Sequence, residues 1–175
     1  MPLSSPTIDS VAFARGGRRI EGEVALAQLQ RLAEFVATSE GALRYAIEGL
    51  IDNDGNPAAD LHLVGQLSLI CQRCNAPLIF SIDRTTRFRF VATEDELNSL
   101  PIEDDEIDAI VGSPNMSIHA WVEDEAILSL PLVPRHDECA ALLGSDDIAS
   151  PVPAPKPFAV LLALRDDADG NDRLN

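Results

Sequence analysis

Three cysteines and one histidine are the residues of this 175-residue sequence whose types and spacing fit a defined chemistry. Cys71 and Cys74 enclose two residues, and His136 and Cys139 repeat that spacing later in the chain. Thiolates and imidazole are the usual ligands of a four-coordinate structural zinc ion, and a knuckle turn between two strands can aim two thiolates at one ion. The four side chains are therefore a candidate Cys₃His zinc site, provided that folding brings the two halves together.

The Cys71–Cys74 pair also fits two other interpretations. A thioredoxin-type redox pair normally begins a helix, whose dipole lowers a thiol pKa, but here Pro77 and an alternating apolar pattern follow. In the other interpretation the two residues are reduced thiols, partly buried at the end of a hairpin without a metal. Because the number of cysteines is odd, a disulfide framework is not expected.

Motifs for other chemistry are missing from the sequence. It contains no GxxxxGK[ST], GxGxxG or GxSxG pattern, so we expect no ATP or dinucleotide ligand. Glu123-Asp124-Glu125 is a cluster of carboxylates, but consecutive residues point in different directions around a helix, so we expect a solvated acidic face there. The residues alone therefore predict a binding domain and not an enzyme.

Alternating apolar and polar residues predict the strands that carry the cysteine pair. A short strand is expected at 20–24, and an antiparallel meander of three strands at about 42–91, with a turn at Asp54-Gly55. The cysteine pair lies between the second and third strands of this meander. Arg84 interrupts the apolar side of the third strand, which predicts either a bulge or an edge where the side chain reaches solvent.

Two predicted helices cover the apolar face of this sheet. Apolar residues at helical spacing predict the first over 25–37. The second is predicted at about 117–130, with Ser117 as its N-cap and Pro131 after its end. The expected fold class is α+β, an antiparallel β-meander covered by two helices.

The distribution of proline and acidic residues predicts how the chain is divided. Residues 1–143 are expected to form a single α+β domain with the CxxC hairpin and an acidic loop at 94–106. Residues 144–175 read as a Pro-rich linker and an apolar docking tail that contains Phe158. With no apolar run long enough to span a membrane and no signal-peptide pattern, we expect a cytoplasmic protein without a membrane partner.

Net charge limits the kinds of partner. The chain has 13 Lys and Arg against 29 Asp and Glu, a net charge of −16, and residues 91–175 contribute −15 of it, from 4 basic and 19 acidic residues. Such a body repels phosphate, which argues against DNA and against broad contact with RNA. A small basic surface for limited RNA contact is predicted at Arg73, Arg84, Arg87 and Arg89.

Four sequence blocks occur in a defined order over most of the chain. They are Cys71-Gln72-Arg73-Cys74 with Pro77-Leu78, then Glu106-Ile107-Asp108, then the run from Val122 to Pro134 with His136 and Cys139, and last Lys156-Pro157-Phe158-Ala159-Val160-Leu161. As an ordered set they resemble the large ribosomal RNA subunit accumulation protein family of bacteria, known as YceD. The chain departs from that family at its end, where the family tends to finish in basic residues and this sequence has Asp166, Asp167 and Asp169.

The resemblance implies a non-catalytic ribosome-biogenesis factor that supports synthesis, processing or accumulation of the large-subunit (23S) rRNA. Combined with the charge, it leads us to expect an acidic adaptor for a basic large-subunit ribosomal protein or assembly factor. The residues expected to contact that partner are Glu123, Asp124, Glu125 and Phe158. The alternatives are a metal-dependent rRNA-processing nuclease and a zinc-stapled structural module.

Overall fold

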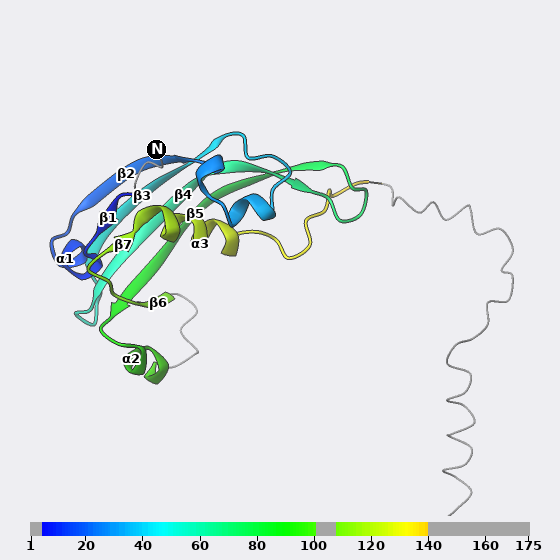
Figure 1. Ribbon diagram of the computed structural model, residues 1–175. Helices are drawn as coiled ribbons and strands as arrows, with labels where there is room; N and C mark the ends of the chain where they lie inside the picture. Colours follow the sequence, from blue (N-terminus) through cyan, green and yellow to red (C-terminus); the bar gives the residue numbers. More distant parts are fainter. Residues whose placement is uncertain (1–4, 101–107, 140–175) are drawn as a thin grey trace, which may run out of the picture. The chain divides into compact units, whose positions relative to one another are not determined.

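The computed structural model describes residues 5–100 and 108–139, and a five-stranded sheet is its framework (Figure 1). The strand order is β2-β3-β4-β5-β6. Two further short strands, β1 (Thr7–Ile8) and β7 (Met116–Ser117), pair with each other in antiparallel orientation. The bounds of the five strands are Arg19–Ala25, Ala42–Ile51, Pro57–Ile70, Pro77–Val91 and Asp108–Val111.

The predicted meander is confirmed as β3, β4 and β5, and the predicted strand at 20–24 is β2. Neighbouring strands from β2 to β5 are antiparallel. In the turn between β3 and β4, the Asp52 carboxylate accepts hydrogen bonds from the backbone N–H groups of Asp54 and Asn56, and Gly55 has a φ of 84°. The sequence did not predict β6, which pairs in parallel with the last four residues of β5.

Of the two predicted helices, the later one is confirmed as α3 (Ile118–Leu128). Its N-cap is Ser117, whose hydroxyl accepts a hydrogen bond from the Ala120 N–H at 3.2 Å. At 25–37 the prediction of an amphipathic α-helix is wrong, because β2 continues to Ala25 and two 3₁₀ turns follow, η1 (Leu26–Gln28) and η2 (Leu32–Glu34).

Three buried leucines fix the path of the chain through the two 3₁₀ turns. Leu26, Leu29 and Leu32 are each at most 2% exposed and recur every three residues. Leu26 and Leu32 begin η1 and η2, whereas Leu29 lies between the turns with a ψ of 84°, which no helix continues through. The spacing also resembles an α-helical pattern, which is why the sequence alone favoured an α-helix.

Two short helices were not predicted. The first, α1 (Ser10–Arg15), is capped by Asp9 and packs on β3 at Gly49. A Cβ at Gly49 would lie 2.6 Å from the Phe13 carbonyl oxygen and 2.8 Å from Ala14 Cα, so only glycine permits this approach. The second is α2 (Glu94–Ser99), so the expectation of an acidic loop over 94–106 is wrong for its first six residues.

In α2, the acidic residues stabilise the helix start. The Thr93 hydroxyl accepts a hydrogen bond from the Glu96 N–H, and the Glu96 carboxylate accepts one from the Ala92 N–H. This is close to a capping box, and negative charge is favourable at a helix N-terminus. The other acidic residues of the predicted loop, 103–106, lie outside the described residues, as does the predicted tail at 144–175 with Phe158, so the domain boundary stays a prediction.

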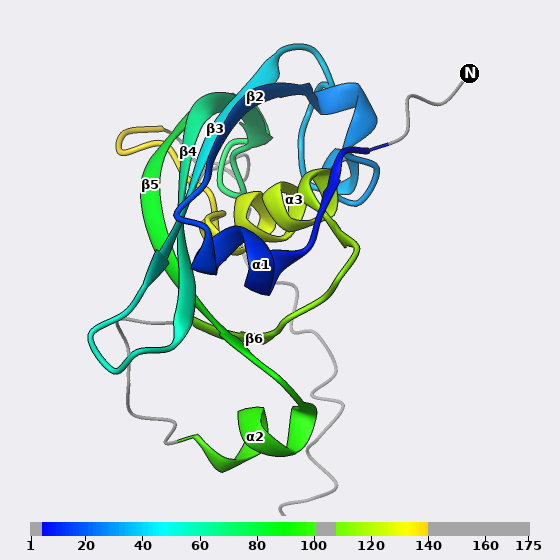
Figure 2. The same cartoon turned by 90° about the vertical axis from the view of Figure 1, so that its left-hand side faces the viewer.

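One apolar core lies between the concave face of the sheet and the helices, and Figure 2 shows the sheet curving around α3. Trp121 of α3 packs edge-on against Phe88 and Phe90 of β5, with ring centroids 5.1 and 5.9 Å apart. The α+β fold class is therefore confirmed. Within residues 5–100 and 108–139, no helix is long and apolar enough to cross a membrane.

Candidate metal centre

A tight turn between β4 and β5 presents the first two cysteines. Cys71 follows the last residue of β4, and its N–H donates a hydrogen bond to the Ala76 carbonyl at 2.9 Å. Its own carbonyl accepts one from the Asn75 N–H, also at 2.9 Å. Asn75 adopts a φ of 58°, a left-handed conformation that asparagine tolerates better than most residues. The turn therefore keeps the Cys71 and Cys74 thiols on one side, as in a zinc knuckle.

The segment after α3, residues 129–139, returns to this turn and brings the second pair of ligands (Figure 1). The Gln72 N–H donates to the Pro134 carbonyl at 2.8 Å. The Arg73 guanidinium donates to the carbonyls of His136 and Asp137 at 2.8 and 3.3 Å. These backbone contacts place His136 and Cys139 beside the knuckle although they lie more than sixty positions from it in the sequence.

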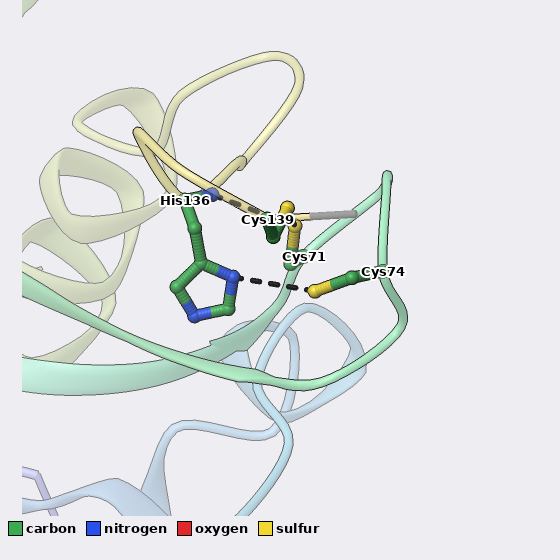
Figure 3. A group of neighbouring side chains, drawn as sticks. All are labelled: Cys71, Cys74, His136 and Cys139. Carbon is green, nitrogen blue, oxygen red and sulfur yellow. Dashed lines mark hydrogen bonds between the residues drawn. The ribbon is translucent and has the colours of Figure 1, made fainter. Parts of the chain in front are cut away.

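The four candidate ligands converge on one point (Figure 3). Their ligand atoms all lie within 4.8 Å of one another, with 3.7 Å between Cys71 Sγ and Cys139 Sγ and 3.4 Å between Cys74 Sγ and His136 Nδ1. Tetrahedral zinc with its usual bond lengths requires about 3.8 Å between two sulfurs and about 3.6 Å between sulfur and nitrogen. The arrangement fits a Cys₃His metal site, and all three cysteines are free of disulfides.

The hydrogen bonds of His136 define which ring nitrogen can bind a metal. His136 Nε2 lies 3.1 Å from the Pro77 carbonyl oxygen, which can only accept a hydrogen bond. Nε2 therefore carries the proton, and Nδ1 presents its lone pair toward the Cys74 sulfur (Figure 3). A metal-binding histidine normally has its other nitrogen fixed by a carbonyl or carboxylate in this way.

Backbone N–H groups favour the thiolate form of Cys71. Burial by itself raises the pKa of this thiol, but the N–H groups of Cys74, His136 and Arg73 outweigh it and lower the pKa to about 5. The His136 N–H, for example, donates to the Cys71 sulfur at 3.4 Å. Since the thiolate is the form that binds a metal ion, the site is prepared for metal at neutral pH.

The other two sulfurs have different surroundings. The Ala76 N–H lowers the pKa of Cys74, but burial and the neighbouring sulfurs together raise it. Arg73 Nε donates to the Cys139 sulfur at 2.9 Å, and this bond raises the pKa of the arginine. Arg73 was predicted to contact RNA, whereas its guanidinium lies within the cluster and donates to the Cys139 sulfur and the His136 carbonyl.

The number of ligands indicates what a metal would do here. Four protein ligands fill a tetrahedral zinc ion and leave no position for a substrate, which is typical of structural sites. The redox interpretation is weakened because the CxxC pair lies between β4 and β5 and does not begin a helix. Reduced thiols without a metal remain the alternative to a zinc ion.

The expected solvated acidic face on α3 is wrong for two of its three carboxylates. Glu123 and Glu125 are 8% and 2% exposed, and only Asp124 is exposed. Burial keeps Glu123 and Glu125 from a partner surface, so of the three carboxylates only Asp124 stays a predicted partner contact. The two side chains are buried because each accepts hydrogen bonds from an element that is distant in the sequence and packs against α3.

The Glu123 carboxylate binds the start of η2. It accepts hydrogen bonds from the backbone N–H groups of Arg31 and Leu32 at 2.7 and 3.1 Å, and from Arg31 Nε at 3.1 Å. These N–H groups begin a helical turn, which a carboxylate stabilises. No local signal at Arg31 or Leu32 predicts this contact.

The Glu125 carboxylate instead joins α3 to β5. It accepts a 2.6 Å hydrogen bond from the Thr86 hydroxyl and lies 3.4 Å from Arg84 Nε. Pairing between β4 and β5 is unbroken from Ala58 to Ile70, so the bulge considered at Arg84 is absent from these two strands. The other expectation for Arg84 fits: its side chain is 54% exposed, at a part of β5 that β6 does not cover, while its Nε meets the buried Glu125 carboxylate.

The four arginines predicted to contact RNA do not form one surface. Arg84 lies on the core face of β5, whereas Arg87 and Arg89 lie on the opposite face. Arg87 forms a bidentate salt bridge with Asp60, with both distances 2.7 Å. Arg89 forms salt bridges with Asp52 and Asp54 at 2.7 and 2.8 Å. Each of these side chains, like Arg73, is already bonded to an acceptor within the chain, and RNA contact stays an untested prediction.

Comparison with known proteins identifies the family. The family model described as "Large ribosomal RNA subunit accumulation protein YceD" matches residues 59–165, more than half of the chain. The chain belongs to the YceD family. A YceD protein of Haemophilus influenzae with that same description is 29% identical over 170 residues, which cover 91% of this chain and 94% of the relative. No solved structure matches significantly. The YceD match includes both halves of the Cys₃His cluster.

Proposed function

We propose that this YceD protein supports the accumulation of large-subunit ribosomal RNA, and that it does so as a non-catalytic adaptor. The family match over residues 59–165 is the observation that carries the link to rRNA. The adaptor role is our inference from charge. An acidic protein attracts cationic polypeptide and repels phosphate, so a basic ribosomal protein or assembly factor suits it better than bare RNA.

Charge pairing in the described residues supports this choice of partner. The described residues contain ten arginines against nineteen Asp and Glu. The four arginines considered for RNA are bonded to sulfur, carbonyl or carboxylate acceptors of the same chain. What remains exposed is mainly acidic, including Glu94 and Asp95 of α2. A cationic protein surface is the natural complement of this charge.

We also propose that Cys71, Cys74, His136 and Cys139 hold a structural zinc ion. The fit rests on four donors of the right type within 4.8 Å of one another and on the proton placement at His136. Zinc would join the segment 129–139 to the turn between β4 and β5. The metal thus serves the adaptor by stabilising its shape, and it takes no part in a reaction.

A genetic and a biochemical experiment test the proposed function together. In a bacterial strain that lacks its own copy of this protein, the wild-type chain should restore the ratio of 23S to 16S rRNA. The tagged chain should recover a basic ribosomal protein or a precursor particle from lysate at low salt, and lose it at high salt. Recovery of neither at low salt would contradict the adaptor role.

A nuclease assay separates the adaptor from the enzyme alternative. A metal-dependent nuclease requires carboxylates that converge on hard cations, but Glu123 and Glu125 accept hydrogen bonds from within the chain. We expect no cleavage when purified protein is incubated with precursor rRNA and Mg²⁺. Cleavage that the variant Asp124→Asn abolishes would show that the adaptor proposal is wrong.

A further inference from the structure

An apolar groove lies next to the candidate metal centre. It has a volume of about 560 Å³ and runs between η2, the end of β4 and the segment that follows α3. Its apolar lining includes Phe35, Leu69, Ile127, Leu130 and Leu132. This volume lies in the range of sites that take a ligand or the anchoring side chains of a partner. None of the four candidate zinc ligands lines the groove.

Exposed apolar side chains gather around this groove. Six large hydrophobic residues of the described chain are exposed, and two of them, Phe35 and Leu132, line the groove at 53% and 102% exposure. Leu128 and Val133, at 73% and 50%, belong to the adjoining end of α3 and the segment after it. Contiguous exposed apolar surface on a soluble protein typically marks an interaction site, because its exposure to water is unfavourable.

The charge of the groove indicates the chemistry of its partner. Glu34 is the only charged residue among those that line it, it is exposed, and no ion pair within the described residues uses it. We propose that this groove binds a segment of a basic protein in which apolar side chains are flanked by Lys or Arg. The apolar side chains would fill the groove, and the flanking cations would face Glu34 and be attracted by the net negative charge of the chain. This inference rests on the proposed adaptor function and assigns it a surface.

The candidate metal centre borders one wall of the groove. Gln72 and Pro134 both line it, and they are joined by the 2.8 Å hydrogen bond from the Gln72 N–H to the Pro134 carbonyl. Pro134 lies two residues before the ligand His136, and Gln72 lies directly after the ligand Cys71. A metal ion bound by both segments would fix their separation and, with it, the width of the groove. Binding of the partner segment should therefore depend on metal.

A labelled peptide tests this proposal with the full-length protein. The probe is a 15-residue amphipathic peptide of Leu and Lys, and its anisotropy is measured at low and high salt. One comparison peptide has Glu in place of Lys, and another has Ser in place of Leu. We expect only the Leu/Lys peptide to bind, with affinity that falls as salt rises.

Matched variants locate the binding surface. Phe35→Ser and Leu132→Ser should each weaken binding about tenfold, as expected when an apolar anchor loses its contact. Ile51→Ser is the control, because Ile51 is 48% exposed and pairs with Pro57, at the end of β4 opposite to Leu69 and the groove. Glu34→Gln should reduce the salt dependence of peptide binding. Glu23 is an exposed carboxylate of β2, and Glu23→Gln should leave that salt dependence unchanged.

Three results would overturn the proposal. The first is equal loss of binding in Ile51→Ser and Leu132→Ser, or equal binding of the Glu peptide. The second is sedimentation showing a dimer that Leu132→Ser dissociates, since the occupant would then be a second copy. The third is about tenfold tighter peptide binding by a variant with Phe158→Ser and Leu161→Ser, since the chain's own apolar tail would then be the competing occupant.

The rRNA assay distinguishes failure of the groove from failure of the function. If Leu132→Ser loses peptide binding but still restores the 23S to 16S ratio, the adaptor function uses another surface and the groove assignment is wrong. If the wild-type chain binds the peptide but does not restore the ratio, the proposed function fails while the groove stands. Leu132→Ser should melt like the wild type, because its side chain is fully exposed.

Discussion

Replacing Glu123 by alanine tests how α3 is fastened to η2. The substitution removes the carboxylate that accepts the N–H groups of Arg31 and Leu32 and the Nε of Arg31. The Leu32 N–H is buried and would lose its acceptor. An unsatisfied buried donor costs about 1–3 kcal/mol, and a hydrogen bond to a charged group contributes about 1.5–3 kcal/mol. We expect the free energy of unfolding to fall by about 3 kcal/mol.

Thermal and urea unfolding followed by circular dichroism measure this effect. At about 4 °C per kcal/mol for a domain of this size, the Tm of Glu123→Ala should fall by roughly 10 °C. Glu123→Gln keeps one acceptor oxygen, so its free energy of unfolding should fall by about a third as much as that of Glu123→Ala. Asp124→Ala is the matched control, since this neighbour also pairs with Arg31 but its side chain is 54% exposed, so its loss should cost at most about 0.5 kcal/mol. Equal losses in Glu123→Ala and Asp124→Ala would refute the reasoning.

Three further variants test other contacts. Arg84→Ala removes a cation from Glu125, whose side chain is 2% exposed, and should lower stability by about 1 kcal/mol in urea unfolding. Arg87→Ala should stay within about 0.5 kcal/mol, because its partner Asp60 is 27% exposed and water can replace the lost contact. The reverse order would contradict the role given to Arg84. Gly49→Ala forces α1 away from β3 and should cost about 2 kcal/mol by the same measurement, with Glu48→Ala as the neutral neighbour. Arg73→Met removes the donor to the Cys139 sulfur and should weaken zinc binding about tenfold in a chelator competition; unchanged affinity would show that the guanidinium does not support the site.

The strands and the ligand set could be predicted because their signals are local. Alternation over 42–91 reflects one buried face of a sheet, and this pattern does not depend on what covers the face. The two-residue spacing of the cysteines, repeated at His136 and Cys139, indicates ligand type and pairing. Whether the halves meet depends on the chain after α3, and the contact between Gln72 and Pro134 that joins them has no signature in either segment.

The errors have a common physical cause in tertiary contacts. Leu26, Leu29 and Leu32 fit an α-helix as well as two 3₁₀ turns, and packing against the core decides between them. The Glu123 and Glu125 side chains look solvent-exposed in sequence because carboxylates usually are. Their burial depends on donors about 92 and 39 residues away, so no local pattern could reveal it.

Metal content of the purified protein tests the central claim, that a Cys₃His zinc ion joins the segment 129–139 to the turn between β4 and β5. The native chain, purified without chelator, is analysed by inductively coupled plasma mass spectrometry and melted with and without EDTA. The account predicts about one zinc per chain, a lower Tm after EDTA, and loss of the metal in Cys74→Ser. Absence of metal in the native protein, with an unchanged Tm after EDTA, would contradict it.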